Sequence, residues 1–312
     1  IGNMLFNWRM LQTTGEEKYA DVMETSLYNS VLAGVSLDGK KFFYTNPLRL
    51  SKDFPYTLRW PRERQSYISC FCCPPNTVRT LCEAQNYAYS ISQKGVWFNL
   101  YGGNQLDTKL TDGSVLKLTQ VSDYPWDGKV VTTVDKVASK KAFSMNFRIP
   151  EWCEKATLTV NGKPVDADLS AGKYAEVNRV WKKGDVVELN LAMTVKLMES
   201  NPLVEETRNQ TVVKRGPLVY CLESMDVEGG QSIDNVLIPA NIQLTPNKIT
   251  IDGSPIVALD GEAQLMNEGS WKGTLYKQVS DSSKKVKIRL IPYYAWGNRG
   301  KADMTVWMPL AR

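Results

Sequence analysis

The pattern of apolar residues changes once along the chain, near residue 93, and this change restricts the folds open to it. Before residue 93, apolar side chains recur every three to four positions, which is typical of α-helices. After it, they alternate with polar side chains in short segments separated by turn residues, which indicates antiparallel strands. The sequence therefore predicts an α+β multidomain protein that is helical first and β-rich afterwards.

The helical part is expected to begin with a hairpin of two helices. In residues 3–14, Met4, Trp8 and Leu11 keep helical spacing, and Gly15 supplies a C-terminal stop. Residues 16–34 continue with the same period, which predicts a second, antiparallel helix. A third helix is expected over residues 76–92.

The β-rich part divides into two groups of predicted strands, without an internal repeat or a Gly/Ser linker. The first group comprises 96–101, 114–121, 129–137, 142–149, 156–160, 174–180 and 186–198. The second comprises 211–222, 236–238, 263–265, 276–278, 286–292 and 304–308. Strands at this spacing predict β-sandwiches. We expect domains at 1–92, 93–200 and 201–312, the last being a second sandwich or an extension whose final strands return to the first.

Composition excludes several functions. The 38 basic and 33 acidic residues give a net charge of +5 and form no long run of one sign, which argues against nucleic-acid or membrane-surface binding. No apolar stretch approaches the roughly 18 residues that a transmembrane helix needs. The chain has no histidine, so Ser-His catalysis, Cys-His catalysis and histidine-ligated zinc are excluded within it.

Three of the six cysteines, Cys70, Cys72 and Cys73, lie within four positions just before a pair of prolines. Pro75 suits the first turn of a helix. Cys72 and Cys73 would then lie at a helix N-terminus, where the macrodipole and unpaired N–H groups favour a thiolate.

Three accounts of this cluster stay open. The thiols could be buried packing material, or one could form a disulfide with a distant cysteine, since the adjacent Cys72 and Cys73 could pair only with strain. A metal site fits best, although the local thiols do not complete a tetrahedral zinc site. The isolated Cys82, Cys153 and Cys221 are interpreted as buried small hydrophobic residues.

Asp21 and Glu24 lie three positions apart in the second predicted helix. Such a pair could serve in acid–base catalysis. The interpretation we favour is that they are early acidic residues on an exposed helical face.

The run Cys72-Cys73-Pro74-Pro75-Asn76 resembles the signature of glycoside hydrolase family 127 and of its relative, family 146, the β-L-arabinofuranosidase group. The resemblance extends nearly end to end, through residues 19–21, 27–29, 43–48, 124–126, 148–152, 181–185, 215–220 and 292–296. It implies that residues 1–92 are the last helices of a truncated (α/α)6 catalytic barrel, followed by antiparallel β-sandwich domains. The chain is then expected to be a glycosidase.

The resemblance also implies the chemistry of the site. Cys72 would be both nucleophile and zinc ligand, and Cys73 a zinc ligand only. A metal-bound thiolate attacks an anomeric carbon at neutral pH, and the resulting thioglycosyl intermediate is hydrolysed with retention. Tyr44 matches a position expected to face the sugar, with core packing as the alternative.

Other matching residues receive weaker interpretations. Trp60 and Trp296 could stack on sugar faces, although core packing is favoured, and Cys70 could tune the other two thiols as a neighbour. Structural roles are assigned to Arg148, Trp152, Trp181 and Asp185.

The resemblance places part of the site outside this sequence. The remaining zinc ligands, a Glu-x-Cys pair, are expected a few residues before Ile1, and the acid–base glutamate further upstream. We therefore expect the chain to be the C-terminal part of a longer protein, and its location, in the bacterial periplasm or the cytoplasm, is left open.

The predicted substrate is an oligosaccharide or plant-type glycan with a terminal β-L-arabinofuranosyl or related residue, and a homodimer is left open. The alternatives are a non-catalytic carbohydrate-binding or scaffolding module and a glycosidase of the same family with another sugar specificity. Specificity depends on pocket walls that the motif does not contain.

Overall fold

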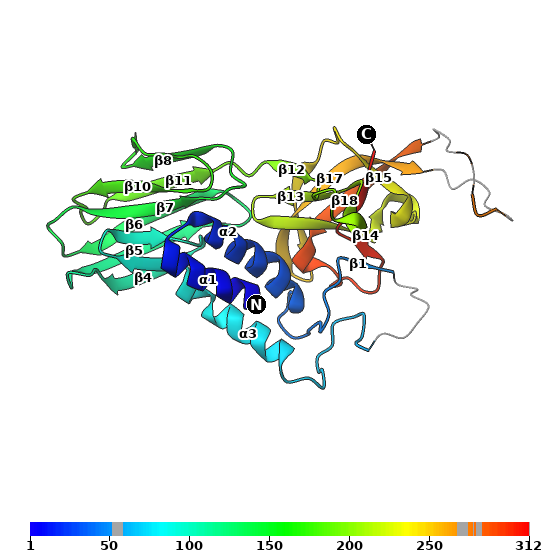
Figure 1. Cartoon of the computed structure of the whole chain (residues 1–312), viewed down its shortest axis with the longest axis horizontal. Coiled ribbons are helices and arrows are strands. Elements are labelled where there is room, and N and C mark those ends of the chain that lie inside the picture. The colour runs from blue at the N-terminus through cyan, green and yellow to red at the C-terminus, as the bar shows by residue number, and fades with distance from the viewer. Residues whose placement is uncertain (52–58, 267–273, 277, 279–282, 312) are drawn as a thin grey trace. The chain divides into compact units, whose positions relative to one another are not determined.

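The computed structural model describes residues 1–51, 59–266, 274–276, 278 and 283–311 (Figure 1). The chain forms two compact units, each built from two segments that are separated in the sequence. The first unit contains residues 1–31 and 76–194, and the second contains 32–75 and 195–312. The domain limits expected at residues 92 and 200 stay a prediction. Among the described residues, no helix is long and apolar enough to cross a bilayer.

The predicted helical hairpin is present. Helix α1 (Gly2–Thr14) ends at Gly15, whose positive φ of 71° lets its N–H bond to the carbonyl of Leu11. Helix α2 (Glu17–Thr25) packs beside α1 and passes into a π-helix (Ser26–Val31) and a 3-10 turn (Leu32–Gly34).

The third helix, α3 (Cys73–Glu83), differs from the prediction at both ends. It begins at Cys73 and is followed by a 3-10 turn (Ala84–Tyr87), so the prediction of helix up to residue 92 is wrong. Strand β2 (Tyr89–Ser92) occupies those last residues because they pair with β3 (Gly95–Phe98). The described residues contain three α-helices, and their place in an (α/α)6 barrel stays a prediction.

Two sheets of the first unit share one core. One has the order β10-β7-β3-β2 and the other β4-β5-β6-β11-β8-β9. Most neighbours are antiparallel, as predicted, but β3 and β7 are parallel. The further bounds are β4 (Asn104–Lys109), β5 (Val115–Ser122), β6 (Lys129–Val137), β7 (Phe143–Ile149), β8 (Ala156–Val160), β9 (Lys163–Pro164), β10 (Lys173–Arg179) and β11 (Val186–Leu191). Large buried side chains from both sheets, including Phe98, Phe147, Leu116 and Leu158, fill the space between them.

The second unit is built on a ten-stranded arrangement rather than a simple sandwich. Its order is β1-β19-β14-β18-β17-β15-β20-β13-β12, with β16 paired to β17. The bounds are β1 (Arg49–Leu50), β12 (Val195–Met198), β13 (Gln210–Arg215), β14 (Leu218–Val227), β15 (Val236–Pro239), β16 (Thr245–Ile251), β17 (Ser254–Met266), β18 (Ser283–Pro292), β19 (Met304–Thr305) and β20 (Met308–Ala311). The strand predicted at 276–278 is absent at Tyr276 and Gln278, and its middle residue lies outside the described residues.

A buried ion-pair cluster joins α2 to the four-stranded sheet. Arg148 on β7 is fully buried and pairs with the carboxylates of Glu17, Asp21 and Glu24. Glu24 also accepts hydrogen bonds from Tyr124, at 2.6 Å, and from Trp152, at 3.2 Å. The interpretation of Asp21 and Glu24 as residues of an exposed helical face is therefore wrong: Glu24 is 1% exposed. The structural role assigned to Arg148 agrees with these contacts.

Glu17 is the carboxyl group of this cluster whose charged form is least stabilised. Neither of its carboxylate oxygens has a hydrogen-bond partner, although its ion-pair distance to Arg148 is 3.5 Å. Burial, helped by the neighbouring Asp21 and Glu24, raises the pKa of Glu17 to about 9. The folded protein therefore holds this carboxyl group protonated at neutral pH.

We expect Glu17→Gln to stabilise the first unit as pH rises. The pKa of Glu17 is raised on folding, so its contribution to stability is fully present below its unfolded value of 4.5 and is lost as pH rises toward about 9. Glutamine imitates the neutral form at every pH. Urea unfolding at several pH values should show an advantage of the variant of about 1–3 kcal/mol at pH 8 and little advantage at pH 4. An advantage that is the same at both pH values would contradict the raised pKa.

Candidate active site and metal centre

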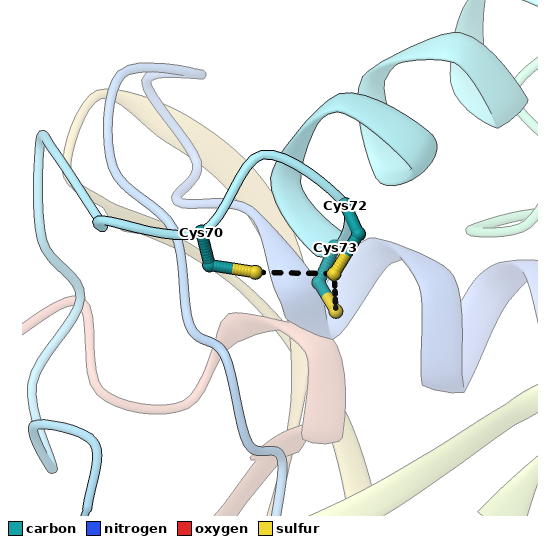
Figure 2. Close-up of side chains that lie close together, drawn as sticks. All are labelled: Cys70, Cys72 and Cys73. Carbon is teal, nitrogen blue, oxygen red and sulfur yellow. Dashed lines mark hydrogen bonds between the residues drawn. The ribbon is translucent and has the colours of Figure 1, made fainter.

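The three clustered thiols converge at the start of α3. Cys70 lies on the segment that leads into the helix, Cys72 immediately precedes it, and Cys73 is its first residue. Figure 2 shows their sulfur atoms turned toward one another. The Sγ of Cys72 lies 3.1 Å from that of Cys70 and 3.4 Å from that of Cys73. Cys72 is exposed, so reagents in solvent can reach it.

The geometry of the thiols fits a metal ion. All three sulfur atoms lie within 4.8 Å of one another. Zinc–sulfur bonds of about 2.3 Å in a tetrahedron place sulfur ligands about 3.8 Å apart. Small side-chain rotations would bring the three thiols to that spacing, so the cluster can hold a metal. Of the three accounts of the cluster, buried packing does not agree with the exposure of Cys72, and none of the three cysteines forms a disulfide with another described residue.

The helix N-terminus acts on a different thiol from the one predicted. Hydrogen bonds from the backbone N–H groups of Cys73 and Cys72 lower the pKa of Cys70 to about 7. The side chains of Cys70 and Cys73 raise the pKa of Cys72 to about 11. The expectation of a thiolate at Cys72 from the helix terminus alone is therefore wrong. Without a cation, Cys72 is protonated at neutral pH.

Tyr44 lies beside the thiols. Its hydroxyl hydrogen-bonds to the side chain of Cys73, and this bond and the nearby thiols raise its pKa. The ring stacks on Trp60 with centroids 4.0 Å apart. Both side chains are half-buried. Tyr44 is therefore within reach of a molecule bound at the thiols, and its stacking on Trp60 restricts the motion of its ring.

Arg64 fixes the segment that precedes the cysteines, and sequence reasoning missed it. Its buried guanidinium donates to the backbone carbonyls of Ala33, Tyr294 and Trp296. It also lies 4.3 Å from the ring centroid of Phe43, which stacks on Trp296. Trp296 is 2% exposed, so it is a core residue and does not offer a sugar-stacking face. No local pattern marks Arg64, because its partners lie far away in sequence.

The remaining predicted residues are placed as follows. Cys153 and Cys221 are buried as predicted, but Cys82 is exposed on α3, so its interpretation as a buried residue is wrong. Trp181 and Asp185 make structural contacts. Trp181 is buried and donates a hydrogen bond to the carbonyl of Phe143, and Asp185 accepts hydrogen bonds from the side chain of Asn161 and the N–H of Lys182.

Comparison with known proteins identifies the family. Residues 1–86 match the model "Beta-L-arabinofuranosidase, GH127 catalytic domain", 95–193 match the GH127 middle domain, and 195–309 match the glycoside hydrolase family 127 C-terminal domain. A non-reducing end β-L-arabinofuranosidase of Bifidobacterium longum subsp. longum is 33% identical over 98% of this chain and 48% of its own length.

Solved structures agree. A glycoside hydrolase matches all of this chain and 51% of its own, with a TM-score of 0.96 and 66% identity. A GH127 β-L-arabinofuranosidase from Geobacillus stearothermophilus T6 matches 99% of this chain and 49% of its own, with a TM-score of 0.89 and 36% identity. The chain thus spans about half the length of these relatives. Because three consecutive family models cover nearly all of its residues, the chain belongs to glycoside hydrolase family 127.

Proposed function

We propose that this chain carries the nucleophile of a retaining glycosidase that removes terminal β-L-arabinofuranosyl or related residues from plant-type glycans. The observation that carries the proposal is the position of Cys72. It is exposed, it lies within 3.4 Å of two other thiols, and it belongs to a chain of family 127. The relatives' names supply the sugar, since they are β-L-arabinofuranosidases.

In this proposal Cys72 and Cys73 hold a zinc ion. A bound zinc ion would keep the thiols deprotonated at neutral pH. The family resemblance supplies the remaining ligands from residues before Ile1. Cys70 lies 3.1 Å from Cys72 and acts as a neighbour that tunes its charge.

Cys72 then performs the covalent step. Its Sγ electron pair forms a bond to the anomeric carbon while the glycosidic carbon–oxygen bond breaks, and the leaving oxygen takes a proton from the acid–base carboxyl group. Water next attacks the same carbon, gives its proton to that carboxylate, and releases Cys72 Sγ. Two displacements restore the original configuration. Tyr44, held by Cys73 and Trp60, contacts the sugar beside the nucleophile.

Metal removal tests the proposal. The full-length protein should contain about one zinc per chain by plasma mass spectrometry, as a tetrahedral thiolate site predicts. Prolonged treatment with a strong chelator should abolish hydrolysis of p-nitrophenyl β-L-arabinofuranoside, and zinc should restore it. Activity that survives complete metal removal would refute the zinc role.

Residues 1–312 expressed alone should neither retain zinc through dialysis nor hydrolyse this substrate, because the resemblance places the other ligands and the proton donor before Ile1. Robust turnover by this chain alone would contradict that placement.

A further inference from the structure

A concave site lies in the first unit and is built only from its residues. It is a cavity of about 450 Å³, within the range of about 300–1,000 Å³ that is typical of small-molecule sites. One wall is a single face of α1, where Trp8, Leu11 and Gln12 project at helical spacing. The other wall comes from the edge strand β2, its neighbour β3, and Tyr174 on β10.

The aromatic side chains of the cavity are held in place. Trp97 and Tyr174 meet edge to face with centroids 5.0 Å apart, and Trp8 meets Tyr87 in the same way at 5.3 Å. Trp8, Trp97 and Tyr174 are each half-buried, so part of each ring remains accessible. Fixed and partly exposed rings are surfaces on which a ligand can stack without a large loss of side-chain entropy.

The polar groups of the cavity are arranged by the protein as well. Asn99 is buried, accepts a hydrogen bond from Tyr174 at 2.8 Å and donates to the hydroxyl of Ser90 at 2.9 Å. Trp97 donates to the hydroxyl of Ser92 at 3.0 Å. A hydroxyl that accepts from the protein keeps its own O–H to donate. Ser90 and Ser92, two positions apart on β2, therefore direct donors to one side of the strand.

The charge of the lining selects the ligand class. Of the described residues that line this cavity, none has a charged side chain. An acidic sugar or a phosphate ester would lack a cationic partner here, and a purely apolar ligand would cover hydroxyl and amide groups without bonding them. A neutral saccharide fits both conditions, because its C–H face packs on aromatic rings while its hydroxyl groups exchange hydrogen bonds.

We propose that the cavity between α1 and the β2–β3 hairpin binds a neutral saccharide unit of a glycan, independently of the cysteine cluster. The proposal does not depend on the proposed function. A site of this kind would hold the polymer without cleaving it. All of its residues lie in the first unit, whereas Cys70, Cys72 and Cys73 belong to the second.

Affinity electrophoresis of the full-length Cys72→Ser variant tests the proposal, because that background removes turnover. Soluble arabinan and arabinogalactan are the neutral probes, and polygalacturonate is the acidic one. We expect a neutral probe to retard the protein. Trp8→Ala or Trp97→Ala should weaken this retardation at least about tenfold, from loss of a stacking surface. Phe6→Ala, an exposed ring on α1 that does not line the cavity, should not change it.

Gln12→Ala guards against variants that fail to fold, since Gln12 is exposed and its removal leaves the core intact. We expect it to weaken retardation about threefold to tenfold, as for the loss of one hydrogen bond. Three results would each overturn the proposal: no retardation by either neutral probe, equal retardation of the Cys72→Ser protein with and without the cavity substitutions, or stronger retardation by polygalacturonate.

Discussion

Replacing Cys72 with serine should abolish turnover by the full-length protein while leaving its fold unchanged. A serine hydroxyl is a far weaker nucleophile than a thiolate and a poorer zinc ligand, so kcat should fall by at least about 1,000-fold. The side chain of Cys72 is exposed, so its replacement removes no core packing. Initial rates on p-nitrophenyl β-L-arabinofuranoside, with thermal unfolding as the check on the fold, measure both effects.

Cys82→Ser is the matched control for this variant. Cys82 is also an exposed cysteine, but it lies on α3 about two and a half turns beyond Cys73 and outside the thiol cluster. We expect it to keep wild-type activity. Equal losses in the two variants would indicate general damage to the helix, and an active Cys72→Ser variant would exclude Cys72 as the nucleophile.

The second large effect concerns stability. Arg148→Met should destabilise the first unit by about 3–5 kcal/mol, because it leaves the buried carboxylates of Asp21 and Glu24 without their cation. Denaturant unfolding followed by circular dichroism measures the change. The double replacement of Asp21 by Asn and Glu24 by Gln, added to Arg148→Met, should recover much of the loss because it removes the uncompensated charges.

Arg289→Met is the comparison for the Arg148 variant. Arg289 also pairs with a carboxylate, that of Asp260, but both side chains are more than one-third exposed. Water screens such a pair, so the expected loss is below about 1 kcal/mol. If both arginine variants lose the same stability, burial is not what makes the Arg148 cluster important.

The sequence predicted the strands and helix ends whose bounds depend on neighbouring residues. The strands at 129–137 and 156–160 were predicted at their observed bounds, and Gly15 ends α1 as expected. Tyr89–Ser92 was predicted as the end of the third helix. Pairing with Gly95–Phe98 decides otherwise, and such pairing overrides local propensity.

The candidate site follows the same division. The sequence alone singled out Cys70, Cys72 and Cys73, because their crowding is visible in one dimension. The burial of Glu24 could not be seen, since its partner Arg148 lies 124 residues away. The lowered pKa of Cys70 could not be predicted either, because it depends on which sulfur atom the backbone N–H groups of Cys73 and Cys72 face.

The anchoring of Arg64 also bears on how the protein is made. Two of its carbonyl partners, at Tyr294 and Trp296, are 230 and 232 residues further along the chain. At 5–20 residues per second, a ribosome needs roughly ten to fifty seconds to add that length. Throughout that time the segment leading to the thiols is held by neither partner. The segment that leads to the three cysteines is therefore anchored only after Trp296 has been synthesised, and a metal that needs this anchored arrangement binds after that point.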